Sequence, residues 1–376
     1  MMSDLSNTNG GASSSVKMVP VRNLWLLMLY ASDLYRENGD DFFDVEKDPD
    51  KIPDLAARIL CRRVEERLLA RLCTGYVRRE GELSRVRGRI DFLRTERHFL
   101  LSRGRVACRY EELSVNTPRN RFVKTALERA AEMVSESQLA HRCRGLVCAL
   151  RQLGITDGCP RPMEGEVAQF GLYDRQDRPM VDAARLIFEL AIPTESTGTR
   201  RLSVPARNIH WLRKLYEKAV AGFYDVALAE TEWSVTAGRW FQWQTESLTG
   251  RVEAILPEMK TDVILENRRL MRRIVIDTKF NELLVKGWHR ERTLRSGYLY
   301  QIYAYLLSQE GLPGDCFADG ASGVLLHPSA GEDFDESVRI QCHEIRFKTV
   351  NLAGSAEVMR KNLLEVLEPS EVDVRE

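Results

Sequence analysis

The chain has 376 residues, of which 44% are hydrophobic and 29% charged, so it suits a soluble globular protein that is too long for one ordinary core. Its 55 basic and 55 acidic residues cancel. Net charge therefore gives no support to nucleic-acid binding, and any basic surface must be local. No apolar run approaches the roughly 18–20 residues of a membrane-spanning helix, and we expect neither a membrane span nor a signal peptide.

The eight cysteines are scattered along the chain, and no two of them form a C-x-x-C pair. Structural zinc sites need ligand pairs at such spacing, so this pattern argues against one. Scattered thiols are typical of small core residues in a reducing cytosol. We therefore expect a cytoplasmic protein.

The first half of the chain mixes helical and strand patterns. Residues 1–17 are rich in Ser, Asn and Gly and are predicted to be a disordered tail. Apolar residues at helical spacing predict helices over 24–35, 54–73, 121–135, 139–153 and 181–190. Gly75 stands where the second helix should stop, and short strands are predicted at 76–77, 90–92 and 106–113. We predict an α+β domain over residues 18–200.

A polar, Thr/Ser-rich segment at 193–205 is the predicted domain boundary. Beyond it, apolar periodicity predicts helices over 209–228 and 297–308, and a strand over 323–327. The second domain is therefore predicted to cover residues 205–376, and the protein as a whole belongs to the α/β class.

Asp262, Asp277 and Lys279 form the constellation that can carry chemistry. Both aspartates lie in segments that look like strands, joined by a hairpin whose turn is centred on Arg268–Met271. The strand period of two places Asp277 and Lys279 on one face and Thr278 on the other. Antiparallel pairing across that turn sets Asp262 directly opposite Asp277. A D-x-K sequence by itself is more often a solvated strand edge, so the upstream aspartate is what gives it weight.

Two carboxylates at cross-strand distance repel each other unless a cation lies between them. Mg²⁺ prefers carboxylate and water oxygens and often takes only one or two carboxylates from the protein. Such an ion activates water and offsets charge on a phosphate. We therefore predict that Asp262 and Asp277 bind Mg²⁺, for which Mn²⁺ could substitute, and that Lys279 orients the attacking water or stabilises the transition state.

The helix predicted downstream adds two polar residues to this site. Gln301 and Tyr305 are four apart and share a face, which we expect to be exposed, where they could contact a phosphate or water. Leu299, Ile302 and Leu306 form the predicted buried stripe, and Tyr298 and Tyr303 are interpreted as rim tyrosines.

Other candidates are less specific. Glu217, on the helix that opens the second domain, is a further candidate metal ligand, although a solvated helix glutamate fits nearly as well. Trp288, His289, Arg290, Arg292 and Arg295 form a basic, aromatic loop that could contact the DNA backbone, or could be a surface loop without a role. His327 and His343 are expected at strand ends.

Asp262, Asp277-Thr278-Lys279 and Gln301-x-x-x-Tyr305 together resemble the PD-(D/E)xK nuclease superfamily, in its variant with a Gln-x-x-x-Tyr helix. Pro257 stands five residues ahead of Asp262 instead of next to it, a tolerable departure because the proline is not chemical. The chain also resembles the McrC family, the nuclease subunits of McrBC modification-dependent restriction systems. That resemblance rests on Val19–Trp25, Met28–Ala31, Arg87–Phe92, Asn116–Asn120, Met259–Ile264 and Thr349–Leu352.

The resemblance implies a restriction-endonuclease-like second domain, with a central mixed sheet flanked by helices and Asp262, Asp277 and Lys279 as catalytic residues. It also implies a hexameric AAA+ GTPase partner of the McrB type, double-stranded DNA with methylated cytosine as substrate, and an N-terminal domain that docks on the ring and stimulates hydrolysis. No G-x-x-x-x-G-K-[ST] occurs in the chain, which agrees with a nucleotide site in a partner. Arg85, Arg87 and Arg89 are candidate partner-binding residues, with a solvated β-turn as their plainer interpretation.

Two other functions stay open at this point. One is a stand-alone or helicase-linked repair nuclease of the same fold. The other is a non-catalytic activator of an AAA+ ring, which would require a broken site.

Overall fold

The computed structural model describes residues 19–37, 48–158, 170–171, 174–195, 209–286, 291–312 and 314–369. The chain divides into two compact units, one made of Pro53–Ala191 and the other combining Met1–Ile52 with Ile192–Glu376. This division differs from the predicted domains 18–200 and 205–376, because the first helices belong with the second half of the chain. The predicted tail over 1–17 lies outside the described residues.

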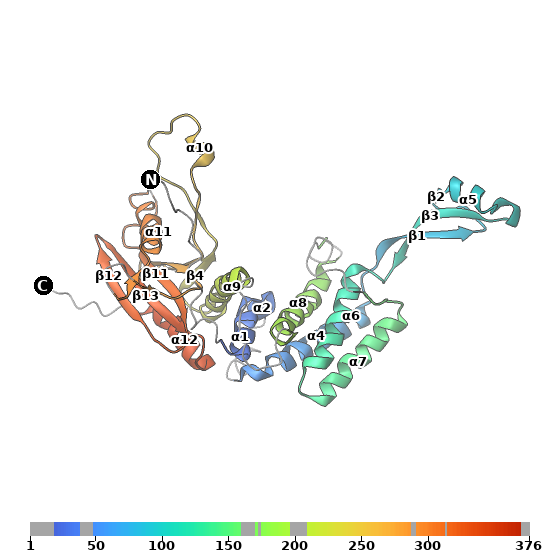
Figure 1. Ribbon diagram of the computed structural model, residues 1–376, viewed down its shortest axis with the longest axis horizontal. Coiled ribbons are helices and arrows are strands. Elements are labelled where there is room, and N and C mark those ends of the chain that lie inside the picture. The colour runs from blue at the N-terminus through green and yellow to red at the C-terminus, as the bar shows by residue number, and fades with distance from the viewer. Residues whose placement is uncertain are drawn as a thin grey trace, which may run out of the picture. The chain divides into compact units, whose positions relative to one another are not determined.

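A six-stranded mixed sheet forms the centre of the larger unit (Figure 1), with the strand order β12-β13-β11-β8-β7-β4. Strand β11 runs parallel to both of its neighbours, and the other pairs are antiparallel. The α/β fold with a mixed sheet is thus confirmed. The strands are β4 (Trp233–Ala237), β7 (Val263–Asn267), β8 (Arg272–Thr278), β11 (Ser322–Ser329), β12 (Asp335–Ile340) and β13 (His343–Asn351).

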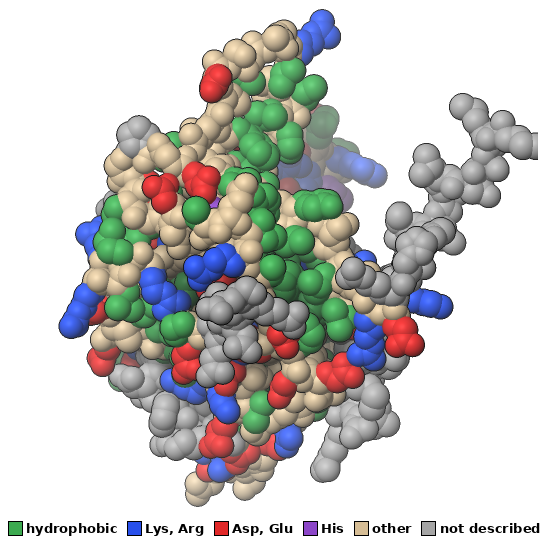
Figure 2. Space-filling view, turned by 90° about the vertical axis from the view of Figure 1, so that its left-hand side faces the viewer, with side chains coloured by type: hydrophobic (Ala, Val, Ile, Leu, Met, Phe, Trp, Pro, Cys, Tyr) green, Lys and Arg blue, Asp and Glu red, His purple; other side chains and the backbone are tan. Residues whose placement is uncertain are grey.

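Smaller elements extend from this sheet. Two-stranded ladders pair β5 with β6 and β9 with β10. Their bounds are β5 (Trp240–Phe241), β6 (Met259–Lys260), β9 (Leu284–Val285) and β10 (Thr293–Leu294). Between β5 and β6 the chain projects outward and carries α10 (Val252–Ile255), and Figure 2 shows hydrophobic side chains exposed on this projection at the top of the view.

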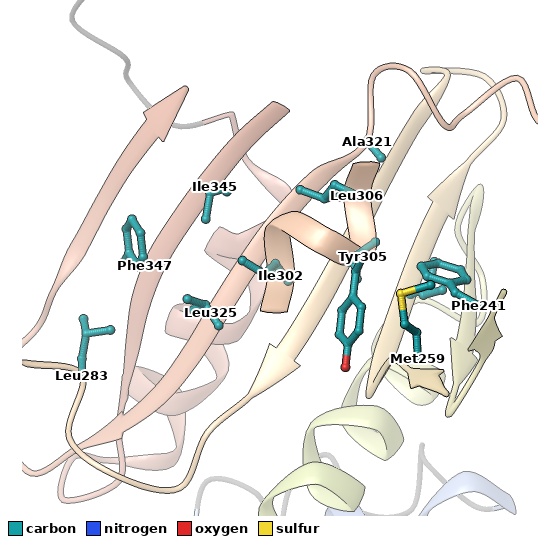
Figure 3. Packing of buried hydrophobic residues seen from close by; sticks show 12 residues of the cluster. Phe241, Met259, Leu283, Ile302, Tyr305, Leu306, Ala321, Leu325, Ile345 and Phe347 are labelled. Atoms are coloured by element: carbon teal, nitrogen blue, oxygen red, sulfur yellow. The ribbon is translucent and has the colours of Figure 1, made fainter. Parts of the chain in front are cut away.

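Helix α11 (Ser296–Leu307) lies against one face of the sheet, where Ile302 and Leu306 pack on Leu325 and other apolar side chains (Figure 3). Gly323 permits this close approach, because a Cβ atom there would lie 2.6 Å from the Ile302 side chain. Strand β8 is buried along nearly its whole length, as expected for a central strand with both faces covered.

Helices α9 (Ile209–Ala227) and α12 (Ala356–Leu364) are joined by a hydrogen bond in which the Tyr224 hydroxyl donates to the Leu363 carbonyl at 2.7 Å. A 3-10 turn, η6 (Glu365–Leu367), follows α12. The bounds of α9 confirm the predicted helix over 209–228, with a difference of one residue at its end. Helix boundaries of this kind vary by one or two residues.

The N-terminal helices pack on α9. They are α1 (Val21–Ala31) and α2 (Asp33–Glu37), separated at Ser32, whose extended backbone divides the single helix predicted over 24–35. Gly222 of α9 has no room for a side chain, since a Cβ atom would lie 2.0 Å from the Tyr30 carbonyl oxygen. The Asn23 amide donates to the Leu352 and Gly354 carbonyls at 2.7 and 2.9 Å. These long-range contacts tie the beginning of the chain to its end.

The smaller unit combines helices with a three-stranded sheet of order β1-β3-β2. Its helices are α4 (Ile52–Ala70), α5 (Phe92–Arg97), α6 (Pro118–Met133), α7 (Ser137–Gln152) and α8 (Arg178–Glu195), with 3-10 turns η3 (Leu101–Arg103) and η4 (Arg175–Asp177) along the chain. The 3-10 turn η2 (Pro49–Lys51), just before α4, belongs to the larger unit. Its strands are β1 (Gly75–Leu83), β2 (Arg89–Ile90) and β3 (Val106–Ser114). Helix α8 continues to Glu195, into the segment predicted to be the domain boundary.

Two local predictions in this unit were wrong. Gly75 does not stop a helix but begins β1, and the left-handed backbone conformation after α4 is at Arg71, with φ of 67°. The strand predicted over 90–92 ends at Ile90, because the Asp91 side chain accepts a hydrogen bond from the Arg94 amide and caps α5.

None of the described helices is both long and apolar enough to cross a membrane.

Candidate active site

The β7–β8 hairpin has the register that the sequence predicts. The ladder begins with Val263 paired to Ile276, and Asp262 and Asp277 are the residues next to that pair, with Asp262 at a bend just before β7. The turn occupies 268–271, and Met271 takes a positive φ of 50°. The two carboxylates therefore occupy neighbouring backbone positions where β7 begins and β8 nears its end.

Asp262 is held by its partner strand. Its Oδ2 accepts hydrogen bonds from both the backbone amide and the hydroxyl of Thr278, each at 2.7 Å. Its carbonyl accepts from the Gly238 amide at 2.9 Å. Thr278 was expected to point to the opposite face, but the bend at Asp262 brings the carboxylate to it. One carboxylate oxygen of Asp262 is thus committed to orienting the side chain.

Asp277 is 2% exposed. Burial raises the pKa of its carboxyl to about 6, the Lys279 ammonium opposes that shift, and the Asp262 carboxylate adds to it. A carboxylate in such surroundings gains from a nearby cation. A metal ion bound beside Asp277 would therefore stabilise the ionised form of this buried carboxyl group.

The Lys279 ammonium is held from three directions. Its Nζ lies 2.7 Å from Asp277 Oδ2, and it donates to Gln301 Oε1 at 3.0 Å. The ring of Tyr298 lies beneath it, with the centroid 5.0 Å away. Its backbone amide donates to the Leu326 carbonyl of β11. Lys279 and Asp277 thus share a face, as the strand period predicts.

Gln301 and Tyr305 extend this network through the protein. Gln301 Nε2 donates to the Tyr305 hydroxyl at 2.7 Å, and that hydroxyl donates to the Lys260 carbonyl at 3.0 Å. Gln301 is half-buried and Tyr305 is only 6% exposed, so the exposed face predicted for them was wrong. Figure 3 shows the Tyr305 hydroxyl directed past Met259, away from the axis of α11. Their polar atoms are thus occupied by each other, by the Lys279 ammonium and by the Lys260 carbonyl.

Glu217 is half-buried on α9, and burial followed by the Asp262 carboxylate raises the pKa of its side chain. Among the described residues, no group of three or more His, Cys, Asp or Glu side chains is arranged to hold a metal ion. Two aspartates with water suffice for Mg²⁺, so the donor set fits that ion without Glu217 as a direct ligand. Glu217 as a ligand stays a prediction.

Comparison with known proteins places the chain in a family. Residues 5–312 match the model of the family described as McrBC 5-methylcytosine restriction system component. The chain belongs to this family. The resemblance to the McrC family drawn from the sequence is thereby confirmed.

A curated relative in this McrBC family is the type IV methyl-directed restriction enzyme EcoKMcrBC of Escherichia coli strain K12. It is 23% identical over 93% of this chain and 98% of its own length. Two solved structures are also similar. A half-complex from a tetradecameric assembly of Thermococcus gammatolerans McrB AAA+ hexamers with bound McrC matches with 16% identity, a TM-score of 0.39, and coverage of 84% of this chain and 68% of its own. The T. gammatolerans McrBC complex matches with 18% identity, a TM-score of 0.33, and coverage of 48% of each chain.

Two of the arginines predicted to bind DNA, Arg292 and Arg295, stand just before α11 in this McrBC family chain. Arg295 precedes the helix, and its guanidinium lies 5.9 Å from the Tyr298 ring centroid. Arg292 is exposed and pairs with Glu332 at 3.4 Å. Trp288, His289 and Arg290 lie outside the described residues.

The arginines predicted to bind a partner lie in the smaller unit, far along the chain from the carboxylates. Arg85, Arg87 and Arg89 are all exposed. Arg87 lies over the Tyr110 ring at 4.5 Å and pairs with Glu112 at 3.4 Å. These three arginines lie at the surface beside the β1-β3-β2 sheet, and their partner-binding role stays a prediction.

Sequence reasoning missed the contribution of Tyr298. Its hydroxyl accepts from the Asn281 amide at 2.6 Å, and its ring lies near His327 with centroids 6.0 Å apart. His327 is buried within β11 instead of at a strand end, and burial lowers the pKa of its imidazole to about 4. His343 begins β13, as expected. The sequence could have revealed Tyr298, because it stands three residues before Gln301 and therefore lies on the same face of the helix.

Proposed function

We propose that the chain is the Mg²⁺-dependent DNA endonuclease subunit of a restriction system that cleaves DNA containing methylated cytosine. The observation that carries this proposal is the convergence of Asp262, Asp277 and Lys279 at neighbouring ends of β7 and β8. Membership in the McrBC family and the methyl-directed activity named for the E. coli relative support the class of substrate.

Asp277 and the free oxygen of Asp262 would hold the metal ion. When bound, Mg²⁺ supplies positive charge that offsets the charge developing on a phosphate in the transition state. Lys279, fixed by Asp277, Gln301 and Tyr298, would hold the attacking water and donate a hydrogen bond to the phosphate. Gln301 and Tyr305 would keep Lys279 in place and link it to the backbone just before Asp262.

We further propose that the chain docks on an AAA+ GTPase ring of the McrB type and stimulates its hydrolysis through the smaller unit. The sequence contains no G-x-x-x-x-G-K-[ST] motif, which agrees with a nucleotide site in a partner chain. The family description as a component of a restriction system also supports a partner.

Reconstitution with that GTPase tests the proposal. Methylated DNA should be cut only with Mg²⁺, GTP and the partner present. Asp277→Ala should abolish cutting and leave the stimulated GTPase rate unchanged, because Asp277 lies in the larger unit. Replacement of Arg85, Arg87 and Arg89 by alanine should instead lower GTPase stimulation. Cutting by Asp277→Ala at the normal rate would show that the site is wrongly assigned.

The same assay separates the other two functions. Cutting with Mg²⁺ in the absence of the partner would favour a stand-alone or helicase-linked nuclease. GTPase stimulation without any metal-dependent nicking would favour a non-catalytic activator, a function that the intact Asp262, Asp277 and Lys279 side chains argue against.

A further inference from the structure

Three lysines lie on two elements that border the proposed metal site. Lys214 and Lys218 are on α9, on either side of Glu217 in sequence, and Lys260 ends β6. All three are exposed. Within the described ranges, no carboxylate oxygen lies within the 4.0 Å ion-pair distance of any of their ammonium groups. Because the chain is neutral overall, a local group of uncompensated cations is informative.

Neighbouring cations behave differently. Arg239 pairs with Glu266 at 3.2 Å, and Arg273 pairs with Glu266 at 2.6 Å and with Asp315 at 2.7 Å. Lys279 is committed to Asp277. The lysines of α9 and β6 thus differ from these paired cations, and they add to the positive charge of Arg295 beside Tyr298.

Packing places α9 against the site. The Tyr216 ring meets the edge of Phe280, the residue after Lys279, with centroids 5.7 Å apart. Lys214 and Lys218 are one helical turn apart and therefore share a face with each other. Together with Lys260, they lower the pKa of the Glu217 carboxyl against the raising effects of burial and Asp262. The three ammonium groups therefore lie near Glu217, on a helix that packs against the residue after Lys279.

Lys260 is held in a way that suits a binding residue. Its carbonyl accepts the Tyr305 hydroxyl, so its backbone is fixed to the same network that holds Lys279. Its ammonium lies over the ring of Trp240, 5.3 Å from the centroid, and Trp240 is 56% exposed. This contact limits the motion of the side chain while leaving its charge accessible to solvent.

We propose that Lys214, Lys218 and Lys260 form a phosphate-binding rim that guides a DNA strand to Asp262 and Asp277. This inference rests on the proposed function. Lysines act as point charges toward phosphates, and each neutralised phosphate releases condensed counterions. The rim therefore predicts a definite salt dependence of DNA binding, separate from the chemistry of cleavage.

The test is equilibrium binding of the full chain to a short fluorescent duplex in EDTA, where the DNA is not cut, at about 50 to 200 mM salt. The variant Lys214→Gln/Lys218→Gln/Lys260→Gln should reduce the slope of log K against log salt by about 2 to 3, or about 0.9 for each lysine. The matched control is Lys51→Gln/Lys361→Gln, which removes exposed lysines that already pair with Asp48 and Glu365. Its slope should equal that of the wild type.

An unchanged slope in the triple variant, with an unchanged melting curve, would overturn the rim. The absence of salt-sensitive DNA binding by the wild-type chain would also overturn it. So would a triple variant that binds DNA normally and is weakened only in its association with a protein partner. If the wild-type complex cuts DNA but the triple variant binds like the wild type, only this inference fails. If no state of the complex cuts DNA, the proposed function fails instead.

Discussion

The charged groups of the carboxylate site and those of the β1–β3 sheet are arranged in opposite ways. In the site, the side chains of Asp277 and Lys279 are 3% and 17% exposed, and each has fixed partners. In the β1–β3 ladder, Arg78 pairs with Glu111 while 92% of its side chain is exposed. Buried charges depend strongly on their geometry, whereas exposed ion pairs contribute little individually. We therefore expect the site to act through a few residues, and the small sheet to act as a surface.

After the loss of cutting expected for Asp277→Ala, loss of the Lys279 ammonium should give the largest effect on cleavage. Lys279→Met roughly keeps the length of the side chain but removes the charge, the ion pair with Asp277 and the hydrogen bond to Gln301. Cleavage by the reconstituted complex should fall about 10²- to 10³-fold, while GTPase stimulation stays at the wild-type level. Single-turnover cleavage rates give the measurement. A comparable loss of cleavage in Arg78→Ala, the exposed counterpart, would contradict the contrast between the two regions.

The pH dependence of stability should reveal the buried carboxyl. The pKa of Asp277 is raised from 3.8 to about 6 in the folded chain, so the folded state binds its proton more tightly than the unfolded state. The resulting stabilisation is complete below about pH 4 and is lost as pH rises through 6. Asp277→Asn lacks this loss and should be more stable than the wild type by about 3 kcal/mol above pH 7 in EDTA.

Denaturant unfolding at pH 4 and pH 8 measures this difference. The two proteins should have nearly equal free energies of unfolding at pH 4. Added Mg²⁺ should stabilise the wild type at pH 8 and have little effect on Asp277→Asn. If the gap between the two proteins is as large at pH 4 as at pH 8, burial of the charge is not its cause.

The Gln301–Tyr305 network should give graded losses. Gln301→Leu removes a direct contact with Lys279 and should slow cleavage about 100-fold. Tyr305→Phe removes one hydroxyl that touches only Gln301 and Lys260, and should slow cleavage about 3- to 10-fold. Tyr303→Phe on the same helix is the control, because its hydroxyl contacts exposed Gln341 instead. Equal losses in Tyr305→Phe and Tyr303→Phe would show that the network has no specific role.

The sequence predicts the central hairpin well because its constraints are local. A turn at 268–271 and a period of two are enough to set the register that ends at Val263 and Ile276, next to Asp262 and Asp277, and to put Lys279 on the same face as Asp277. The helix carrying Gln301 follows from apolar spacing in the same way. These features depend on residues that are close together in the chain.

Features that depend on distant partners were missed. The placement of α1 and α2 with the larger unit depends on Asn23 reaching Leu352, and on the bare backbone of Gly222. The burial of Tyr305 depends on the residues that surround α11, which its own helix does not reveal. Thr278 bonds Asp262 only because the chain bends there. Local periodicity carries no information about such contacts.

The smallest effect should come from the exposed sheet. Arg109 pairs with Glu80 and with Asp91, each at 3.0 Å, yet 60% of its side chain is exposed. Arg109→Ala should change the free energy of unfolding by less than about 1 kcal/mol, because solvent screens both pairs and Arg94 also lies near Glu80. Cleavage should be unchanged. Denaturant unfolding checks the first expectation, and a cost well above 2 kcal/mol would mean that charges in the two regions contribute alike, which would remove the basis for treating the small sheet as a surface.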